Sequence, residues 1–225
     1  MRTSVVMLDA GNTLFVERLG RDELYTRALS DLGLPVDVMR VARLRVAVHD
    51  AMPEQVDGRP RYSEPWFQEY MRRLVTELGG GIDPERVRRR LADDFSRPDT
   101  YVLFADTLDA LEDLTERGLR LALVSNWSRQ LRALLDGLGL SRFFEVTVIS
   151  EEAGLSKPDP GIYRTALEQL DVSAGHAVHV GDHPLNDLAA ARRAGLRALL
   201  LDRHGEHGHD EAAIPSLREI VPRLD

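Results

Sequence analysis

The hydrophobic residues of the chain alternate between short continuous runs and longer segments with helical spacing. The first run, residues 5–8, holds four apolar residues and stops at Asp9, which predicts a strand buried on both faces, as in a parallel sheet. Later runs alternate with helical segments, and this order predicts an α/β fold with a Rossmann-like parallel sheet. Strands are expected at residues 5–8, 119–124, 146–149, 177–180 and 197–201, and helices at 105–117, 129–138, 160–170 and 185–194.

A long helical segment interrupts this alternation after the first strand. Apolar residues recur at helical spacing from Leu24 to Leu32, and further helices are predicted at 36–51 and 66–78. Asp83-Pro84 opens a fourth, because Asp caps helices and Pro is accepted at the first helical position. We therefore predict a core domain of residues 1–15 and 99–225, and an all-helical domain of residues 16–98 inserted after the first strand.

Composition and charge narrow the function classes. The chain has 225 residues, no cysteine and a net charge of −8, so disulfides and thiol chemistry are excluded. An acidic chain without a basic tract argues against nucleic acid or an anionic membrane as a partner. No apolar run reaches the length of a signal peptide core or a membrane span, which predicts a cytoplasmic protein. The sequence specifies no oligomeric state.

Polar residues gather where the predicted strands end. The carboxyl ends of parallel strands share one edge of a sheet, which is where open α/β sheets bind ligands. Carboxylates brought together there need compensating charge, and carboxylate oxygens suit Mg²⁺. This edge receives Asp9 and Thr13, Ser125 and Asn126, Lys157, and Asp182 with Asp187.

The residue types at this edge define a reaction that transfers an anionic group. Asp9 is the candidate nucleophile, and Asp9, Asp182 and a backbone carbonyl are expected to hold Mg²⁺. Ser125, Lys157 and the N–H groups of the turn after Asp9 would hold the anion. Asp187 is a further candidate metal ligand, or would position Lys157 or a metal-bound water. Thr13 and Asn126 complete the expected substrate-binding set.

Lys157 is the only lysine in a chain with 29 Lys and Arg residues. The chain uses arginine at every other cationic position. A compact ammonium group and a guanidinium fork are not interchangeable at a confined site. This count therefore supports a specific function for Lys157.

These residues resemble, in order and spacing, the motifs of the haloacid dehalogenase-like (HAD) hydrolase superfamily across nearly the whole chain. Motif one is similar to the segment 9–14, motif two to Ser125, motif three to Lys157 and motif four to the segment 181–187. The helical insert resembles the C1 cap of the family. The resemblance implies a Mg²⁺-dependent hydrolase of small phosphorylated metabolites that acts through an aspartyl-phosphate on Asp9.

One position departs from the family pattern. The phosphatases of the family carry a second Asp, the general acid/base, two residues after the nucleophile, where this chain has Gly11. The Gly11 carbonyl can still bind the metal, but no carboxyl group can protonate a leaving group. General acid–base catalysis contributes typically ~10²–10⁴-fold. We therefore expect a slow enzyme or one that favours good leaving groups, and we expect Gly11→Asp to speed alkyl phosphate hydrolysis.

Two alternatives follow from Gly11. The first is a 2-haloacid dehalogenase, which needs no acid at this position; Tyr163 is compatible with it, whereas Gly181-Asp182 is not, because dehalogenases of the family bind no metal there. The second is a catalytically weak protein that binds a phosphorylated ligand. A phosphonatase is disfavoured because the insert has no lysine for a Schiff base.

Overall fold

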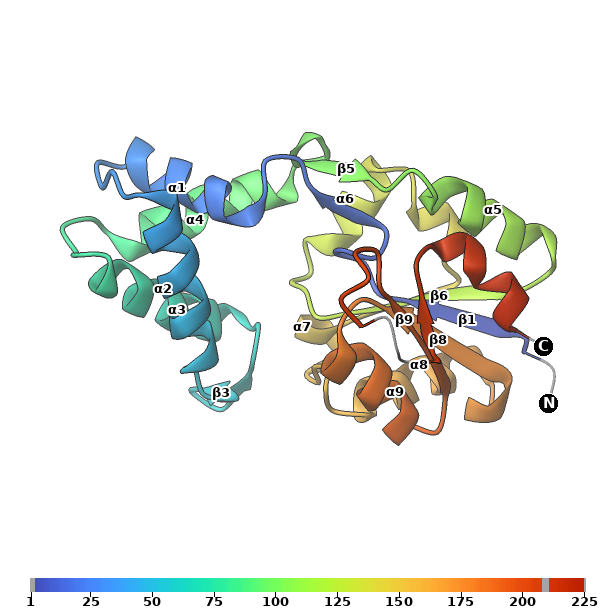
Figure 1. Cartoon of the computed structure of the whole chain (residues 1–225). Coiled ribbons are helices and arrows are strands. Elements are labelled where there is room, and N and C mark those ends of the chain that lie inside the picture. Colours follow the sequence, from blue (N-terminus) through green and yellow to red (C-terminus); the bar gives the residue numbers. More distant parts are fainter. Residues whose placement is uncertain (1–2, 208–210, 225) are drawn as a thin grey trace. The chain divides into compact units, whose positions relative to one another are not determined.

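The chain forms two compact units (Figure 1). In this computed structural model the described residues are 3–207 and 211–224. The first unit joins Met1–Val16 to Leu103–Asp225, and the second is Glu17–Val102. These limits differ by a few residues from the predicted ones. We call the first the core unit and the second the insert unit.

The core unit is built on a parallel sheet with the order β10-β9-β8-β1-β6-β7. β1 lies in the middle, in register with both neighbours, so that Leu8 pairs with Leu123 on one side and Val180 on the other. Its four residues are fully buried, as the uninterrupted apolar run predicts. The strands are β1 (Val5–Leu8), β6 (Arg120–Ser125), β7 (Val146–Ile149), β8 (Ala177–Gly181), β9 (Arg197–Leu201) and β10 (Ala213–Ile214).

Helices cover both faces of the sheet (Figure 1), because successive strand residues point to opposite faces. Val5 and Met7 pack in one cluster with the apolar face of α8, including Ile162 and Tyr163. On the other face α5 contacts β6. The core helices are α5 (Thr107–Glu116), α6 (Leu131–Gly137), α7 (Ser150–Ala153), α8 (Gly161–Leu170) and α9 (Ala190–Arg193). The 3₁₀ turns are Pro98–Thr100 in the insert unit and Ser141–Phe143, Ala174–His176, Leu217–Glu219 and Val221–Arg223 in the core unit.

The insert unit contains the four predicted helices around an apolar core of its own. Trp66, with 1% of its surface exposed, stacks on Tyr70 within this core. The side chain of Asp83 caps α4, as predicted, and the side chain of Asp37 caps α2. The helices are α1 (Arg21–Asp31), α2 (Val38–Asp50), α3 (Glu64–Glu77) and α4 (Pro84–Ser96).

The insert unit also contains a short hairpin that its helical periodicity does not predict. β3 (Gln55–Val56) and β4 (Arg59–Pro60) pair antiparallel. Asp57 and Gly58 between them both have positive φ, at 50° and 72°. Two such residues form the tight turn that matches the twist of a hairpin. The prediction of an all-helical insert is therefore wrong in this segment, because the unit adds a hairpin to its four α-helices.

Further differences from the prediction lie at the ends of predicted elements. β2 (Phe15–Glu17) and β5 (Tyr101–Leu103) form a two-stranded sheet in the two segments that link the units. The predicted helix 185–194 is a π-helix, Pro184–Ala189, followed by α9. π-Helical turns widen the backbone and often mark functional sites. This one carries Asp187.

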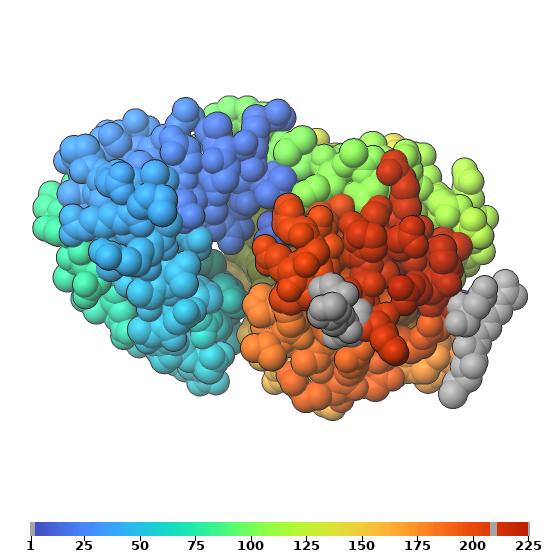
Figure 2. Space-filling view, viewed as in Figure 1, coloured from blue at the N-terminus to red at the C-terminus, as the bar shows by residue number. Residues whose placement is uncertain are grey.

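The last described segment returns to the surface of the core unit beside α5 (Figure 2). The Arg218 guanidinium pairs with Asp109, and the backbone N–H of Leu217 donates to Asp106 Oδ2 over 2.8 Å.

Within the described part of the chain no helix is long and apolar enough to cross a membrane.

Candidate active site

Asp9 is the first residue after the central strand β1. Its backbone N–H donates to the Val180 carbonyl over 3.0 Å, which continues the ladder to β8 by one bond. The residue is 8% exposed, at the edge where the strands end. Ser125, the last residue of β6, is buried at the same edge, in a strand that pairs with β1. Strand order and register therefore bring motifs one, two and four together.

Lys157 holds two carboxylates from two different elements. Its Nζ lies 2.7 Å from Asp9 Oδ1 and 2.7 Å from Asp187 Oδ1. The lysine is 4% exposed. Burial favours the neutral amine, but the charges of Asp187 and Asp9 outweigh it and raise the pKa of Lys157 above its usual range. The ammonium group is therefore charged at neutral pH.

Asn126 fixes the backbone of Lys157 through two hydrogen bonds. Its side-chain amide donates to the Lys157 carbonyl over 2.7 Å, and its Oδ1 accepts the Lys157 N–H over 2.7 Å. Both ends of this side chain are thereby engaged by the protein. The predicted contact of Asn126 with substrate stays a prediction, and the structure gives it a positioning role toward Lys157.

Asp187 is enclosed by donors. Lys157 Nζ and His179 Nε2 contact its Oδ1, the latter over 2.9 Å, and the His183 N–H donates to Oδ2 over 3.0 Å. Burial alone would raise the pKa of Asp187, but Lys157 and His179 outweigh burial and hold it well below its usual range. A Cβ on Gly181 would lie 2.3 Å from Asp187 Cγ, so only glycine leaves room for this carboxylate.

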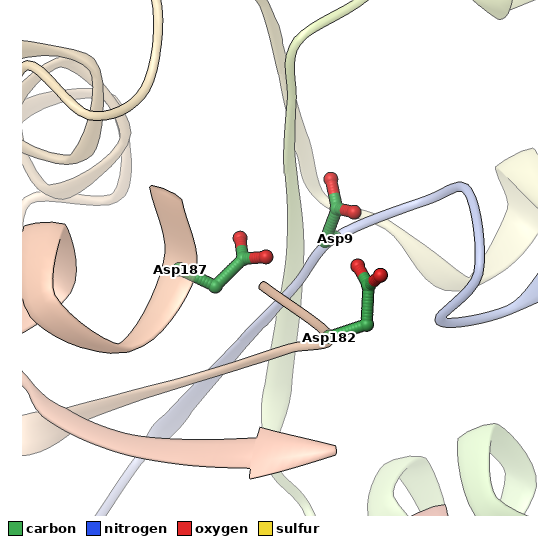
Figure 3. A group of neighbouring side chains, drawn as sticks. All are labelled: Asp9, Asp182 and Asp187. Carbon is green, nitrogen blue, oxygen red and sulfur yellow. The ribbon is translucent and has the colours of Figure 1, made fainter. Parts of the chain in front are cut away.

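Three carboxylates converge at the strand edge. Ligand atoms of Asp9, Asp182 and Asp187 lie within 4.8 Å of one another, and Figure 3 shows them approaching from three segments of the core unit. Burial, together with the charges of Asp9 and Asp187, raises the pKa of Asp182 to about 7. Lys157 alone does not compensate this charge. The set of oxygen donors and the excess negative charge therefore fit a divalent cation such as Mg²⁺.

The raised pKa of Asp182 predicts how stability changes with pH. The folded protein keeps the Asp182 proton up to about pH 7, whereas the unfolded chain loses it near its ordinary pKa of about 4. Without metal, this group therefore lowers the free energy of unfolding as pH rises from about 4 to 7. Mg²⁺ should stabilise the protein more at pH 8 than at pH 5. Denaturant unfolding with EDTA and with Mg²⁺ measures this difference, which Asp182→Asn should remove.

The loop after Asp9 is held by the core unit. The Thr13 carbonyl accepts a hydrogen bond from Arg203 Nη2 over 2.8 Å, and Thr107 Oγ1 donates one to the Leu14 carbonyl over 2.7 Å. Thr13 is fully buried, and its own hydroxyl has no hydrogen-bond partner within the described chain. The substrate-binding role of Thr13 stays a prediction.

Gly11 faces an aromatic side chain. A Cβ built on Gly11 would lie 3.0 Å from Trp127 Cζ3. An Asp at this position would add a carboxyl group beyond that crowded Cβ. The expectation that Gly11→Asp alone speeds alkyl phosphate hydrolysis stays a prediction, and the structure shows that the indole must shift before an Asp fits at this position.

Two functional candidates were not found from the sequence. His179 lies within a strand, where an isolated polar residue gives no local sign of what it faces, and Trp127 lies in the loop after motif two. The alternation of strand residues places His179 on the same face as Val5 and Met7, which is the only signal for it. The contact of His179 with Asp187 depends on the π-helix, which the sequence pattern does not predict.

We expect His179→Leu to weaken the site through Asp187. The substitution removes a buried donor and leaves Asp187 with fewer partners, which costs about 1–3 kcal/mol of unfolding free energy. Lys157 is then less firmly positioned, so kcat should fall more than KM changes. Chemical unfolding and steady-state kinetics test this, with His176→Leu in the 3₁₀ turn before β8 as the control. Equal effects of the two substitutions would contradict a specific role for His179.

Comparison with known proteins agrees with this architecture. The family model described as haloacid dehalogenase-like hydrolase matches residues 3–195. Haloacid dehalogenase-like hydrolase domain-containing protein 3 of Danio rerio is 32% identical, over 97% of this chain and 95% of the relative. Phosphoserine phosphatase of Thermus thermophilus is 37% identical, over 70% of this chain and 62% of its own. The crystal structure of the HAD phosphatase from Thermococcus onnurineus superposes with a TM-score of 0.70 at 22% identity, covering 100% of this chain and 98% of that one.

The chain therefore belongs to the haloacid dehalogenase-like hydrolases. It is a HAD-superfamily hydrolase, and relatives named as phosphatases favour a phosphatase over a dehalogenase. The α/β core with a parallel sheet, predicted from the hydrophobic pattern, is confirmed.

Proposed function

We propose that this protein is a Mg²⁺-dependent phosphatase of small phosphorylated metabolites, with Asp9 as its nucleophile. The observation that carries the proposal is the Asp9 carboxylate, held 2.7 Å from Lys157 Nζ in a group of three carboxylates at the strand edge. The relative named phosphoserine phosphatase supports phosphorylated small molecules as the substrate class. The designation of the insert unit as a C1 cap belongs to the same proposal, as does a cytoplasmic location.

Asp9, Asp182 and the carbonyl of Gly11 would hold the Mg²⁺. Bound there, the ion would offset the repulsion between the carboxylates and an anionic substrate and orient the phosphoryl group. Asp187, which was also a candidate ligand, already accepts from Lys157, His179 and the His183 N–H. We therefore assign Asp187 to the positioning of Lys157.

The reaction transfers the phosphoryl group twice, first from the substrate to Asp9 and then from Asp9 to water. An Asp9 oxygen attacks phosphorus, the bond from phosphorus to the leaving oxygen breaks, and the leaving group departs with the electron pair. Lys157 and Ser125 hold the transferring phosphoryl oxygens. Water then attacks phosphorus, breaks its bond to Asp9, and supplies a hydroxyl to the phosphate and a proton to the departed anion. The Asp9 carboxylate is restored.

The test is phosphate release from a mixed panel of alkyl, aryl and acyl phosphates, with Mg²⁺ and with EDTA. We expect release that requires Mg²⁺ and that is fastest for acyl and aryl compounds. Halide release from 2-haloacids without phosphate release would favour the dehalogenase alternative. Mg²⁺-dependent calorimetric binding of phosphorylated compounds without turnover would instead favour a ligand-binding protein.

A further inference from the structure

The side chain of Trp127 occupies the space next to Gly11. An ideal Cβ on Gly11 would lie 3.0 Å from Cζ3 and 3.8 Å from Cη2 of the indole. Gly11 is two residues after Asp9, in the loop that follows β1. Position 11, where phosphatases of the family carry an acid, therefore has no side chain, and the Trp127 indole lies next to it.

Trp127 is fixed in this place by its surroundings. The buried Ser150 hydroxyl accepts the Trp127 N–H over 3.1 Å and donates to the Trp127 carbonyl over 3.1 Å. The indole also meets the Phe15 ring edge to face, with the ring centroids 5.9 Å apart. Because its backbone and one side of its ring are held, the indole does not simply swing away when a side chain is added at position 11.

We propose that Trp127 is a specificity-determining partner of Gly11: its indole occupies the space that an acid side chain at position 11 would need, so that the two residues together keep the enzyme to weakly basic leaving groups. This inference rests on the proposed function. The indole has no proton to give at neutral pH, so the leaving oxygen departs as an anion, and its proton comes from water after the bond to phosphorus has broken. Acyl and aryl phosphates release such anions readily. Alkyl phosphates release alkoxides, which depart slowly without a proton donor.

The inference predicts a non-additive pair of substitutions. Gly11→Asp alone should leave ethyl phosphate hydrolysis near the wild-type rate, because the indole crowds the Cβ of any side chain at position 11. Trp127→Ala alone should leave it slow as well, because no acid is present. The double variant Gly11→Asp with Trp127→Ala has both the room and the acid, and its kcat/KM for ethyl phosphate should rise about 100-fold or more. Its kcat/KM for acetyl phosphate should not rise.

The matched control is the double variant Gly11→Asn with Trp127→Ala, which has nearly the same shape and no acid. If it hydrolyses ethyl phosphate as fast as the Asp variant, or if Gly11→Asp alone matches the double variant, the inference is overturned. A second measurement needs no substitution: wild-type rates over a series of phenyl phosphates should fall steeply as the leaving phenol becomes more basic. A flat series overturns the inference, even if the double variants fail to fold.

The inference and the proposed function fail in different ways. If the wild-type protein with Mg²⁺ releases no phosphate even from acetyl phosphate, the proposed function itself is wrong. If it releases phosphate from acetyl and ethyl phosphate at similar rates, the phosphatase activity stands, but the effect of the missing acid at Gly11 is contradicted, and with it the role of Trp127.

Discussion

Asp9→Asn should lower kcat for phosphate release by about 10³-fold or more, because it removes the nucleophile on which both transfers depend. The amide has nearly the same shape and leaves Lys157 its second partner, Asp187, 2.7 Å away. Burial and the charge of Asp187 raise the pKa of Asp9 despite Lys157, so removal of its charge should not destabilise the fold. Steady-state phosphate release and thermal unfolding measure the two effects.

Asp113→Asn is the matched control, since Asp113 pairs with Arg117 on exposed surface of α5. This variant should keep both wild-type turnover and wild-type stability. If Asp9→Asn retains more than a small fraction of wild-type turnover while its melting temperature is unchanged, Asp9 is not the nucleophile.

Lys157→Met should be the most destabilising single substitution in the site. It leaves Asp9 and Asp187 buried without their shared cation, and the loss of one partner of a buried ion pair costs about 3–5 kcal/mol. Turnover should fall as well, because the ammonium group that faces the nucleophile and the phosphoryl oxygens is lost. Chemical unfolding of metal-free protein at neutral pH measures the first effect.

The pH dependence of this loss follows from the directions of the pKa shifts. The pKa of Lys157 is raised, so its contribution is present below its ordinary pKa of about 10 and is lost only at higher pH. The pKa of Asp187 is lowered, so its contribution is present above about pH 4 and is lost as pH falls further. The difference between wild type and Lys157→Met should therefore be largest between about pH 4 and 10.

Lys157→Arg is the informative comparison, because it keeps the charge but replaces a compact ammonium by a larger planar fork. We expect it to retain more stability than Lys157→Met and to remain impaired in turnover. A Lys157→Met protein as stable as wild type at neutral pH would show that the two carboxylates do not depend on this cation.

The convergence of Asp9, Lys157, Asp182 and Asp187 could be predicted from the sequence because it depends on a simple geometric rule. Parallel strands end at one edge, and the five strands that the apolar runs predict, β1, β6, β7, β8 and β9, all belong to the parallel sheet. The alternation of these runs with helices was enough to predict the fold class and to separate the insert from the core.

The features that escaped prediction depend on long-range packing. β2 and β5 are three residues long and lie far apart in the chain, so neither has a local periodicity to read. His179 looks like one polar residue in an apolar strand until the π-helix brings Asp187 to 2.9 Å from its Nε2. Gly11 and Trp127 lie more than a hundred residues apart in the chain, and only the structure shows that the indole fills the space where a Cβ of residue 11 would point.

The most direct test of the central claim is to locate the phosphoryl group on the protein. Wild-type enzyme with Mg²⁺ and an excess of acetyl phosphate is quenched in acid, digested and mapped by mass spectrometry, with Asp9→Asn treated in parallel. We predict a phosphoryl group on the peptide that contains Asp9 in the wild type and none in the variant. Phosphate release by the wild type together with a phosphoryl group on another residue, or an equal signal in the variant, would contradict the assignment of Asp9 as nucleophile.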